Sequence, residues 1–226
     1  KTTQSDSTTS TSITGEENKK LLKSSVSYTL GRSTLNNRFD PTEGFIAQIT
    51  ETYSGVGGDV TFLKSQVKTG YYKPYYYNTF TLGLRAKAGY VDGLGEKISQ
   101  SSRFYLGGRS VRGFRGGGIG PRDIGTNSSV GGNYMYAGTA EIISNYGFND
   151  DLGFRWTIFT DVGSVWGTDY PTGVKNPDDD SLRQTLGFGL LWDTAIGPLT
   201  FFWANAIKKE PQDRTKVFQF NIGTRL

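Results

Sequence analysis

The sequence contains no histidine and no cysteine among its 226 residues. The absence of histidine excludes Ser-His-Asp triads, Cys-His pairs and histidine-ligated metal sites. The absence of cysteine excludes disulfide bonds and thiolate chemistry. No apolar run reaches the roughly 18 residues of a membrane-spanning helix, so no transmembrane helix is predicted. We therefore expect no enzyme activity, no catalytic residue, no metal site and no cofactor.

The net charge and the share of apolar residues are also low, and both limit the classes of protein to which the sequence can belong. The net charge is only +4, and lysine and arginine are scattered along the chain, which argues against a nucleic-acid partner. Hydrophobic residues make up only 35% of the chain, a low share for a packed globular core. Aromatic residues (14%) and glycine (31 residues) are abundant. The chain begins at Lys1 without a start methionine or a signal-peptide pattern, so we expect a piece of a longer protein.

Apolar residues recur at every second position through most of the chain, and a helical period is nearly absent. In one segment Leu82, Leu84 and Ala86 alternate with small or charged neighbours. Such alternation predicts strands with one apolar and one polar face. The predicted strands cover nine ranges: 24–36, 45–54, 60–73, 78–91, 133–145, 153–166, 183–193, 199–208 and 217–226.

The chemistry of the two faces favours a membrane barrel. The polar faces carry mainly threonine, glycine, glutamine and asparagine, and the apolar faces are rich in aromatic residues. A barrel with lipid outside and water or a plug inside has this pattern. The alternative that remains open is a soluble β-sandwich, which would carry more charge on its outer face. We predict an all-β fold, an antiparallel transmembrane β-barrel without helices of note. Aromatic residues near strand ends predict interfacial girdles: Tyr71, Tyr72, Tyr75, Tyr76, Tyr77, Trp166 and Tyr170.

The lengths of the connections predict their side of the membrane. Short turns are typical of the periplasmic side and longer loops of the external side. The periplasmic turns would be 37–44, 74–77, 146–153 and 194–198, and the external loops 55–60, 92–132, 167–182 and 209–216. The C-terminus is then periplasmic and residues 1–23 form an external loop segment. Because closed single-chain barrels have even strand numbers, the nine strands of residues 24–226 are predicted to be the C-terminal part of a barrel.

The external loop at about 92–132 contains the glycine- and arginine-rich stretch "YLGGRSVRGFRGGGIGPRD" (105–123). A connection of about 40 residues is far longer than usual and is either functional or disordered. The apolar residues Val111 and Phe114 argue for order, so we expect the loop to fold back into the barrel lumen. A buried Arg112 would then need a carboxylate partner.

Two acidic residues on neighbouring strands are candidate partners of Arg112. Glu141 alternates in phase with Met135 and Ala137, and Asp161 lies in phase with Arg155, so both are predicted to point into the lumen. An arginine between two carboxylates would pin the loop inside the barrel through charge-assisted hydrogen bonds. The alternative is that these are solvated lumen charges of a porin.

Two other patterns are only weak evidence for a binding site. The run "RGGGIG" (115–120) is similar to a phosphate-binding loop, but no helix follows it. The run "PDDD" (177–180) is predicted to be the solvated acidic tip of an external loop, with a divalent-cation site as the alternative.

Four motifs follow one another from residue 107 to the C-terminus: "GGRSVRGF" with "GIGPRD" (107–123), "FTDVGSVW" (159–166), "GPLTFFWANAIKK" (197–209) and "FQFNIGTRL" (218–226). Together they resemble the BamA family of outer-membrane barrel insertases, over the chain beyond about residue 24. The core Val111, Arg112, Gly113 and Phe114 is shared with a wider superfamily that includes two-partner secretion transporters. The resemblance implies a 16-stranded barrel preceded by periplasmic POTRA domains, with Arg112 paired to Glu141 and Asp161.

The resemblance also implies a use for the last strand. In the family, the first and last strands meet at a seam that opens sideways, and substrate strands pair with an exposed edge there. At the predicted seam this chain has Phe218, Phe220, Ile222, Gly223 and Leu226, and Gly223 would weaken strand pairing. The chain departs from the family in ending with Leu226 instead of an aromatic residue, and in a short, cysteine-free stretch at 120–131.

The function implied is the folding and insertion of β-barrel proteins into the bacterial outer membrane, as the core of the assembly machinery. The implied partners are unfolded outer-membrane proteins, accessory assembly lipoproteins, and outer-membrane lipid and lipopolysaccharide. A pore for two-partner protein secretion or for solute passage is the alternative. A barrel hydrolase is a third class, and the absence of histidine argues against it.

Overall fold

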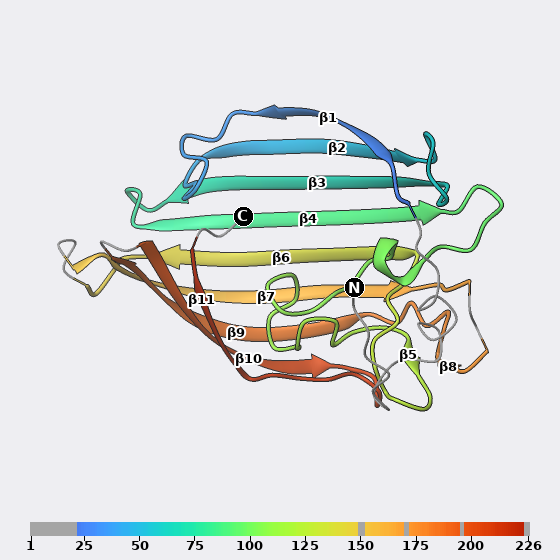
Figure 1. Cartoon of the computed structure of the whole chain (residues 1–226). Coiled ribbons are helices and arrows are strands. Elements are labelled where there is room, and N and C mark those ends of the chain that lie inside the picture. Colours follow the sequence, from blue (N-terminus) through green and yellow to red (C-terminus); the bar gives the residue numbers. More distant parts are fainter. Residues whose placement is uncertain (1–21, 149–151, 170–171, 195–196, 224–226) are drawn as a thin grey trace.

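A computed structural model describes residues 22–148, 152–169, 172–194 and 197–223. Nine long strands form one sheet, in the order in which they follow along the chain (Figure 1). Their bounds are β1 (Ser25–Ser33), β2 (Gly44–Ser54), β3 (Phe62–Tyr75), β4 (Phe80–Asp92), β6 (Tyr134–Ser144), β7 (Phe154–Trp166), β9 (Arg183–Thr194), β10 (Gly197–Lys208) and β11 (Phe218–Ile222).

Every neighbouring pair in this sheet is antiparallel, so the predicted all-β, antiparallel fold class is confirmed. Two additional short strands, β5 (Arg122–Asp123) and β8 (Val174–Lys175), pair with each other at one end of the sheet. Helical structure within the described residues is limited to a single 3-10 turn at Gln100–Ser102. None of the helices in the described part of the chain is long and apolar enough to cross a membrane.

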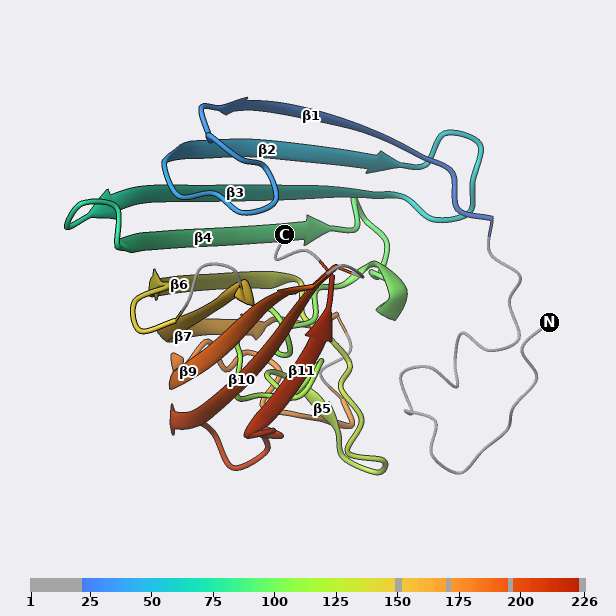
Figure 2. The same ribbon diagram turned by 90° about the vertical axis from the view of Figure 1, so that its left-hand side faces the viewer.

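The sheet is strongly curved. β1 to β4 form one side, and β9 to β11 turn round to form the other (Figures 1 and 2). Within the described residues β1 and β11 are not paired with each other, so the sheet has two open edges. Unpaired main-chain groups at such edges are costly in lipid, because no water satisfies them there. The curved sheet therefore needs further strands, or another chain, to close into a barrel.

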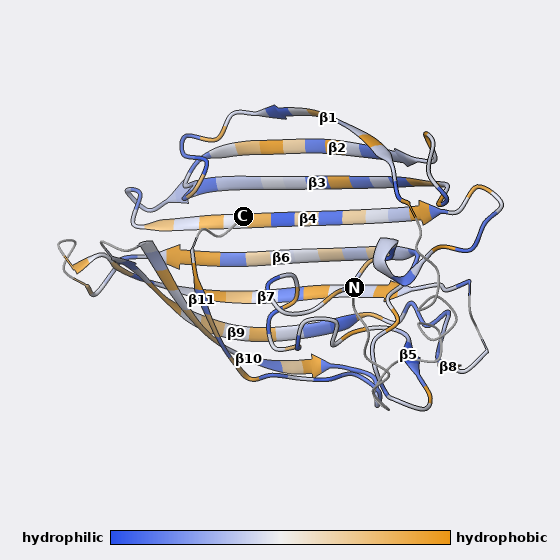
Figure 3. Ribbon diagram, viewed as in Figure 1, coloured by the Kyte–Doolittle hydropathy of each residue, from blue (hydrophilic) through white to orange (hydrophobic). Residues whose placement is uncertain are grey.

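The two faces of the sheet differ as the alternation predicts. Hydrophobic and hydrophilic residues alternate along β4 and β6 (Figure 3). On the convex face Leu84, Ile158 and Phe188 are exposed, as expected for side chains that contact lipid. On the concave face Thr157 and Thr185 are buried. A soluble sandwich would bury the apolar face, so this arrangement disfavours that alternative.

Aromatic side chains gather at the ends of the strands on the convex face. At one end Tyr134 stacks between Tyr90 and Trp166. At the opposite end Phe154 stacks on Trp192. These two ladders have the position expected of interfacial girdles.

The prediction of a girdle is wrong for Tyr72, which is only 6% exposed. Tyr71 points outward, and since successive residues of a strand face opposite sides, Tyr72 points into the concave face. Tyr75, Tyr76 and Tyr77 are exposed at the turn that follows. Tyr170 lies outside the described residues.

The concave side of the sheet is filled by the connection between β4 and β6. Its residues Leu106, Val111, Phe114 and Ile119 are almost completely buried. They pack in one cluster with residues of the sheet: Phe62, Val91, Met135, Ala137 and Val165. The long connection therefore supplies much of the apolar core. It fills the space that in a barrel of this kind is either a polar lumen or a plug.

Candidate functional site

The candidate site is centred on Arg112, in the connection between β4 and β6. The loop reaches the wall of the sheet because Gly113 has no side chain and a φ of +91°. A Cβ at this position would lie 3.1 Å from the Thr185 side chain and 3.2 Å from Ala204 Cβ. Glycine therefore allows the loop backbone to pass directly over β9 and β10.

Arg112 binds Asp161 of β7 through three donors. Its backbone N–H and its Nε both donate to Asp161 Oδ2 at 2.8 Å, and Nη2 donates to Oδ1 at 2.7 Å. This two-point fork uses the planar geometry of the guanidinium, which lysine lacks. The same carboxylate accepts a hydrogen bond of 2.9 Å from the hydroxyl of Thr139, so its position is fixed from a second strand.

Glu141 of β6 completes the cluster. Its Oε2 accepts from Arg112 Nη1 at 3.1 Å, and its Oε1 forms an ion pair of 3.0 Å with Arg85 of β4. Arg112, Glu141 and Asp161 are each at most 5% exposed. Two arginines and two carboxylates thus balance in charge, which a buried cluster requires.

Aromatic rings cover the guanidinium of Arg112. Its central carbon lies 3.3 Å from the ring centroid of Phe159 and 4.9 Å from that of Phe202. Burial by itself lowers the pKa of Arg112, but the hydrogen bonds and charges of Asp161 and Glu141 outweigh burial and raise that pKa above its ordinary value. The side chain therefore stays ionised while it is removed from water.

The other loop residues singled out in the sequence lie in the same place. Val111 and Phe114 have no exposed surface. The carbonyl of Phe114 accepts a hydrogen bond of 2.7 Å from Nε2 of Gln219 in β11. The predicted cluster of Arg112, Glu141 and Asp161 is thus brought together, and Gln219, which sequence reasoning missed, links it to the last strand.

The residues predicted at the seam lie on the opposite side of the sheet from Arg112. The side chains of Phe218, Phe220 and Ile222 are exposed on the convex face. Phe218 packs on Trp203, and Phe220 packs on Phe201 of β10. Gly223 has a φ of +104° and follows the last paired residue. Leu226 lies outside the described residues.

The comparison with protein families agrees with the motifs. A model described as the Omp85 superfamily domain matches residues 1–226. The chain belongs to the Omp85 superfamily. This confirms the resemblance that the four motifs indicate, and it agrees with the curved antiparallel sheet.

Similar proteins include two from bacteria and one from an animal. The outer membrane protein assembly factor BamA of Neorickettsia risticii is 34% identical over 200 residues, which are 88% of this chain and 27% of that protein. BamA of Neisseria meningitidis serogroup B is 30% identical over 220 residues, 86% of this chain and 28% of that protein. A sorting and assembly machinery component 50 homolog of Xenopus tropicalis is 32% identical over 168 residues, 71% of this chain and 35% of that protein.

A solved structure of BamA from Haemophilus ducreyi, lacking POTRA domains 1–3, superposes with a TM-score of 0.79 at 27% identity. It covers 88% of this chain and 42% of that chain. The Omp85 chain described here thus matches a BamA barrel in fold, and it spans about a quarter of the length of the two curated BamA relatives.

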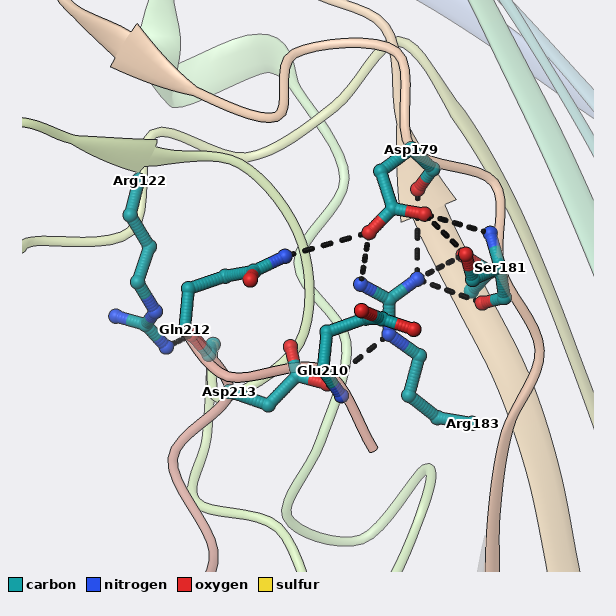
Figure 4. Close-up of polar contacts among 9 residues, drawn as sticks. Arg122, Asp179, Ser181, Arg183, Glu210, Gln212 and Asp213 are labelled. Atoms are coloured by element: carbon teal, nitrogen blue, oxygen red, sulfur yellow. Dashed lines mark hydrogen bonds and ion pairs between the residues drawn. The ribbon is translucent and has the colours of Figure 1, made fainter. Parts of the chain in front are cut away.

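A second buried arginine in this Omp85 chain was not predicted (Figure 4). Arg183, the first residue of β9, has no exposed surface. Its Nε donates to Asp213 Oδ2 at 3.0 Å, and its Nη2 donates to Asp179 Oδ2 at 2.8 Å. Its Nη1 donates to the hydroxyl of Ser164 and to the carbonyl of Ser181. Arg183 therefore ties the connections that follow β7 and β10 to β7 and β9.

The prediction of a solvated acidic tip at 177–180 is wrong for Asp179. Burial by itself raises the pKa of Asp179, but hydrogen bonds from Ser181 and the charge of Arg183 hold that pKa below its ordinary value. Among the described residues no group of acids is arranged to bind a metal ion. The phase of β9, which places Arg183 on the same face as Thr185, is the sequence feature that could have indicated a buried arginine.

Arg122, drawn in the same figure, orders the loop itself. It is 2% exposed and donates to the carbonyls of Gly117 and Asn127 at 2.9 and 3.1 Å. Burial and then the positive charge of Arg214 lower the pKa of Arg122, and Asp213 partly offsets this.

Proposed function

We propose that the full-length protein folds and inserts β-barrel proteins into the bacterial outer membrane, as the core of the assembly machinery. The observation that carries this proposal is the open edge of β11 in a chain of the Omp85 superfamily. The BamA relatives are named outer membrane protein assembly factors. No covalent chemistry is needed, because a strand edge can template an incoming strand through main-chain hydrogen bonds.

The direction of the main-chain groups of β11 follows from two hydrogen bonds at its ends. Ala204 donates to the carbonyl of Val217, and Gly223 donates to the carbonyl of Pro198, each at 2.9 Å. Successive residues of a strand direct their main-chain groups to opposite sides, so residues 217, 219, 221 and 223 face β10. The N–H and C=O groups of Phe218, Phe220 and Ile222 therefore point to the open edge.

In this proposal the loop motif supports the seam from inside. Asp161 and Glu141 hold Arg112, and Phe114 contacts the last strand through Gln219. The outward side chains of Phe218, Phe220 and Ile222 contact lipid, while Gly223 belongs to the end of the strand that a substrate strand approaches. The loop would thus keep the last strand in position when the seam opens.

The proposal includes the surroundings of the protein. The barrel lies in the outer membrane with its C-terminus in the periplasm, and residues 24–226 are the C-terminal part of the barrel. Residues 1–21 of the predicted external segment 1–23 lie outside the described residues. Its partners are unfolded outer-membrane proteins, accessory assembly lipoproteins, and outer-membrane lipid and lipopolysaccharide. A solute pore is less well supported, because Val111 and Phe114 of the loop are packed without exposure against the concave face.

The test removes one main-chain donor from the open edge. In the full-length protein, Phe220→Pro deletes an N–H that points away from β10, so the sheet itself loses no ladder bond. We expect the variant barrel to fold, and we expect the level of newly assembled, heat-modifiable outer-membrane proteins to fall in cells that depend on it. The matched control is Phe220→Ala, which keeps the N–H and is expected to support assembly. Equal assembly by both variants and the unmodified protein would contradict the proposal.

The orientation makes a separate prediction. In intact cells that carry the full-length protein, a cysteine at Asn127 or Lys175, both exposed in external connections, should react with a membrane-impermeant thiol reagent. A cysteine at Tyr77, exposed in the turn between β3 and β4, should react only after the outer membrane is permeabilised. The opposite pattern of labelling would reverse the topology.

A further inference from the structure

The connection between β1 and β2, residues 34–43, reaches across the concave side of the sheet. Arg155 of β7 donates from Nη1 to Oδ2 of Asp40 in this connection. Three strands, β3, β4 and β6, separate β2 from β7 in the sheet, and alternation along β7 places Arg155 on the concave face with Asp161. Figures 1 and 2 show the connection folded down past β2 instead of continuing in line with the strands.

Arg155 joins the connection to the opposite wall through two carboxylates. Besides Asp40, it binds Asp193 of β9, to which its Nη2 donates at 2.7 Å. The side chains of Arg155, Asp40 and Asp193 are 19%, 35% and 52% exposed. Ion pairs that remain in contact with water are weaker than buried ones, so this contact can open at a lower cost than the buried cluster of Arg112.

The connection has a fixed shape of its own. The side-chain oxygen of Asn36 accepts the backbone N–H groups of Thr42 and Glu43 at 3.1 and 3.2 Å. The side-chain oxygen of Asn37 accepts the backbone N–H of Asp40 at 3.2 Å. Such bonds from an asparagine to nearby backbone groups fix a turn. The position of Asp40 within the connection is therefore set independently of Arg155.

A cavity of about 450 Å³ lies between the connection and the wall formed by β9 and β10. Asn37 and Phe39 line it on one side, and Leu191, Pro198 and Thr200 line it on the other. Phe39 remains 61% exposed, so this side chain does not fasten the connection to the wall. The ion pairs of Arg155 do so.

We propose a second role for this chain: residues 34–43 are a strap that closes the mouth of the lumen to ions and small solutes, and Arg155 is the latch that holds the strap. The mouth in question is at the end of the sheet that carries the short turns, which is the periplasmic end in the proposed orientation. The strap closes this mouth because it joins the side of the sheet at β1 and β2 to the opposite side at β7 and β9. The role does not depend on strand templating at β11.

The experiment measures the ionic current through the purified full-length protein in a planar lipid bilayer. Asp40→Ala and Arg155→Ala each remove one partner of the latch. We expect each variant to raise the fraction of time for which the barrel conducts roughly two- to fivefold, the range that the loss of a partly exposed ion pair allows. Asp40 lies outside the strands, so Asp40→Ala keeps the test valid if Arg155→Ala fails to give a heat-modifiable, folded barrel. A conducting fraction equal to that of the unmodified protein in the folded variants would overturn the proposal.

The matched control is Asp193→Ala. It removes the other carboxylate on Arg155 and leaves the bond between Arg155 and Asp40 in place. We expect the current of Asp193→Ala to equal that of the unmodified protein. A rise as large as in Asp40→Ala would show that a lost negative charge at the mouth, rather than release of the strap, increases the current, and it would overturn the proposal.

A crosslink tests whether the position of the strap is the cause. The chain has no cysteine of its own, so Asp40→Cys and Arg155→Cys provide the reactive pair once any cysteine outside residues 1–226 is replaced by serine. Before linkage this double variant should conduct as often as Asp40→Ala. Linkage by a short bis-maleimide should return the conducting fraction to that of the unmodified protein. A conducting fraction that stays high in the linked protein would mean that the strap does not close the mouth.

Discussion

Replacing Arg112 with glutamate in the full-length protein is expected to release the loop, destabilise the barrel and impair assembly of outer-membrane proteins. The cluster holds two arginines and two carboxylates, and a third carboxylate in place of Arg112 leaves three negative charges against Arg85. Breaking a buried ion pair by removing one partner costs roughly 3–5 kcal/mol, because the remaining charge is left uncompensated. The temperature at which the heat-modifiable, folded form is lost measures the effect.

Matched variants separate the geometry of Arg112 from its charge. Arg112→Lys should rescue only in part, because an ammonium cannot offer the fork that binds Asp161 at two oxygens. Arg115→Ala should be tolerated, since Arg115 is exposed and contributes its backbone N–H rather than a buried side chain. A double-mutant cycle between Arg112 and Asp161 gives their coupling energy directly. A coupling energy of zero with fully active Arg112→Ala would favour the porin-like interpretation of these charges.

Replacing Arg183 with alanine is expected to have an effect of comparable size. Arg183 and Asp213 are both fully buried, and a second carboxylate, Asp179, is 17% exposed. Without the arginine, Asp213 keeps a buried negative charge with the backbone N–H of Glu210 as its remaining donor. We expect a loss of about 3–5 kcal/mol in the free energy of unfolding, measured as a lower midpoint in urea in lipid vesicles.

The controls for Arg183 follow from its partners. Asp213→Asn keeps an oxygen that can accept from Arg183 and Glu210, so it should cost less than Arg183→Ala. Arg38→Ala, in the exposed turn between β1 and β2, should leave the midpoint unchanged. A midpoint for Arg183→Ala equal to that of the unmodified protein would mean that the connections after β7 and β10 are held without this ion pair.

The strands could be predicted because their determinants are local. Alternation of apolar and small residues at a period of two depends on the backbone pleat alone, and the predicted range 153–166 differs by one residue from β7. The same local rule predicted that Glu141 and Asp161 share the concave face, where the structure brings both to Arg112. It also predicts that Tyr72 faces away from Tyr71, which the girdle interpretation overlooked.

The partners of Arg183 required the tertiary structure. Asp179 and Asp213 lie in two different connections, and no period or motif relates an aspartate in one connection to an arginine at the start of a distant strand. The run at 177–180 therefore indicated only that this connection is acidic, and not which residue its carboxylates bind. Burial changed its chemistry: once Arg183 is removed from water, a nearby carboxylate becomes its counter-charge rather than a solvated tip.

From the sequence alone came the nine strands of the main sheet, the faces of that sheet, the pairing expected of Arg112 and, through four motifs, the family. The curvature of the sheet and the pairing of loop residues 113–118 with residues 214–216 were decided only in three dimensions. The physical reason is that this contact is made by main-chain N–H and C=O groups, which every residue except proline carries in the same form. Side-chain identity records which face of a strand is buried, whereas the choice of main-chain partner depends on which backbone the folded chain brings within hydrogen-bonding distance.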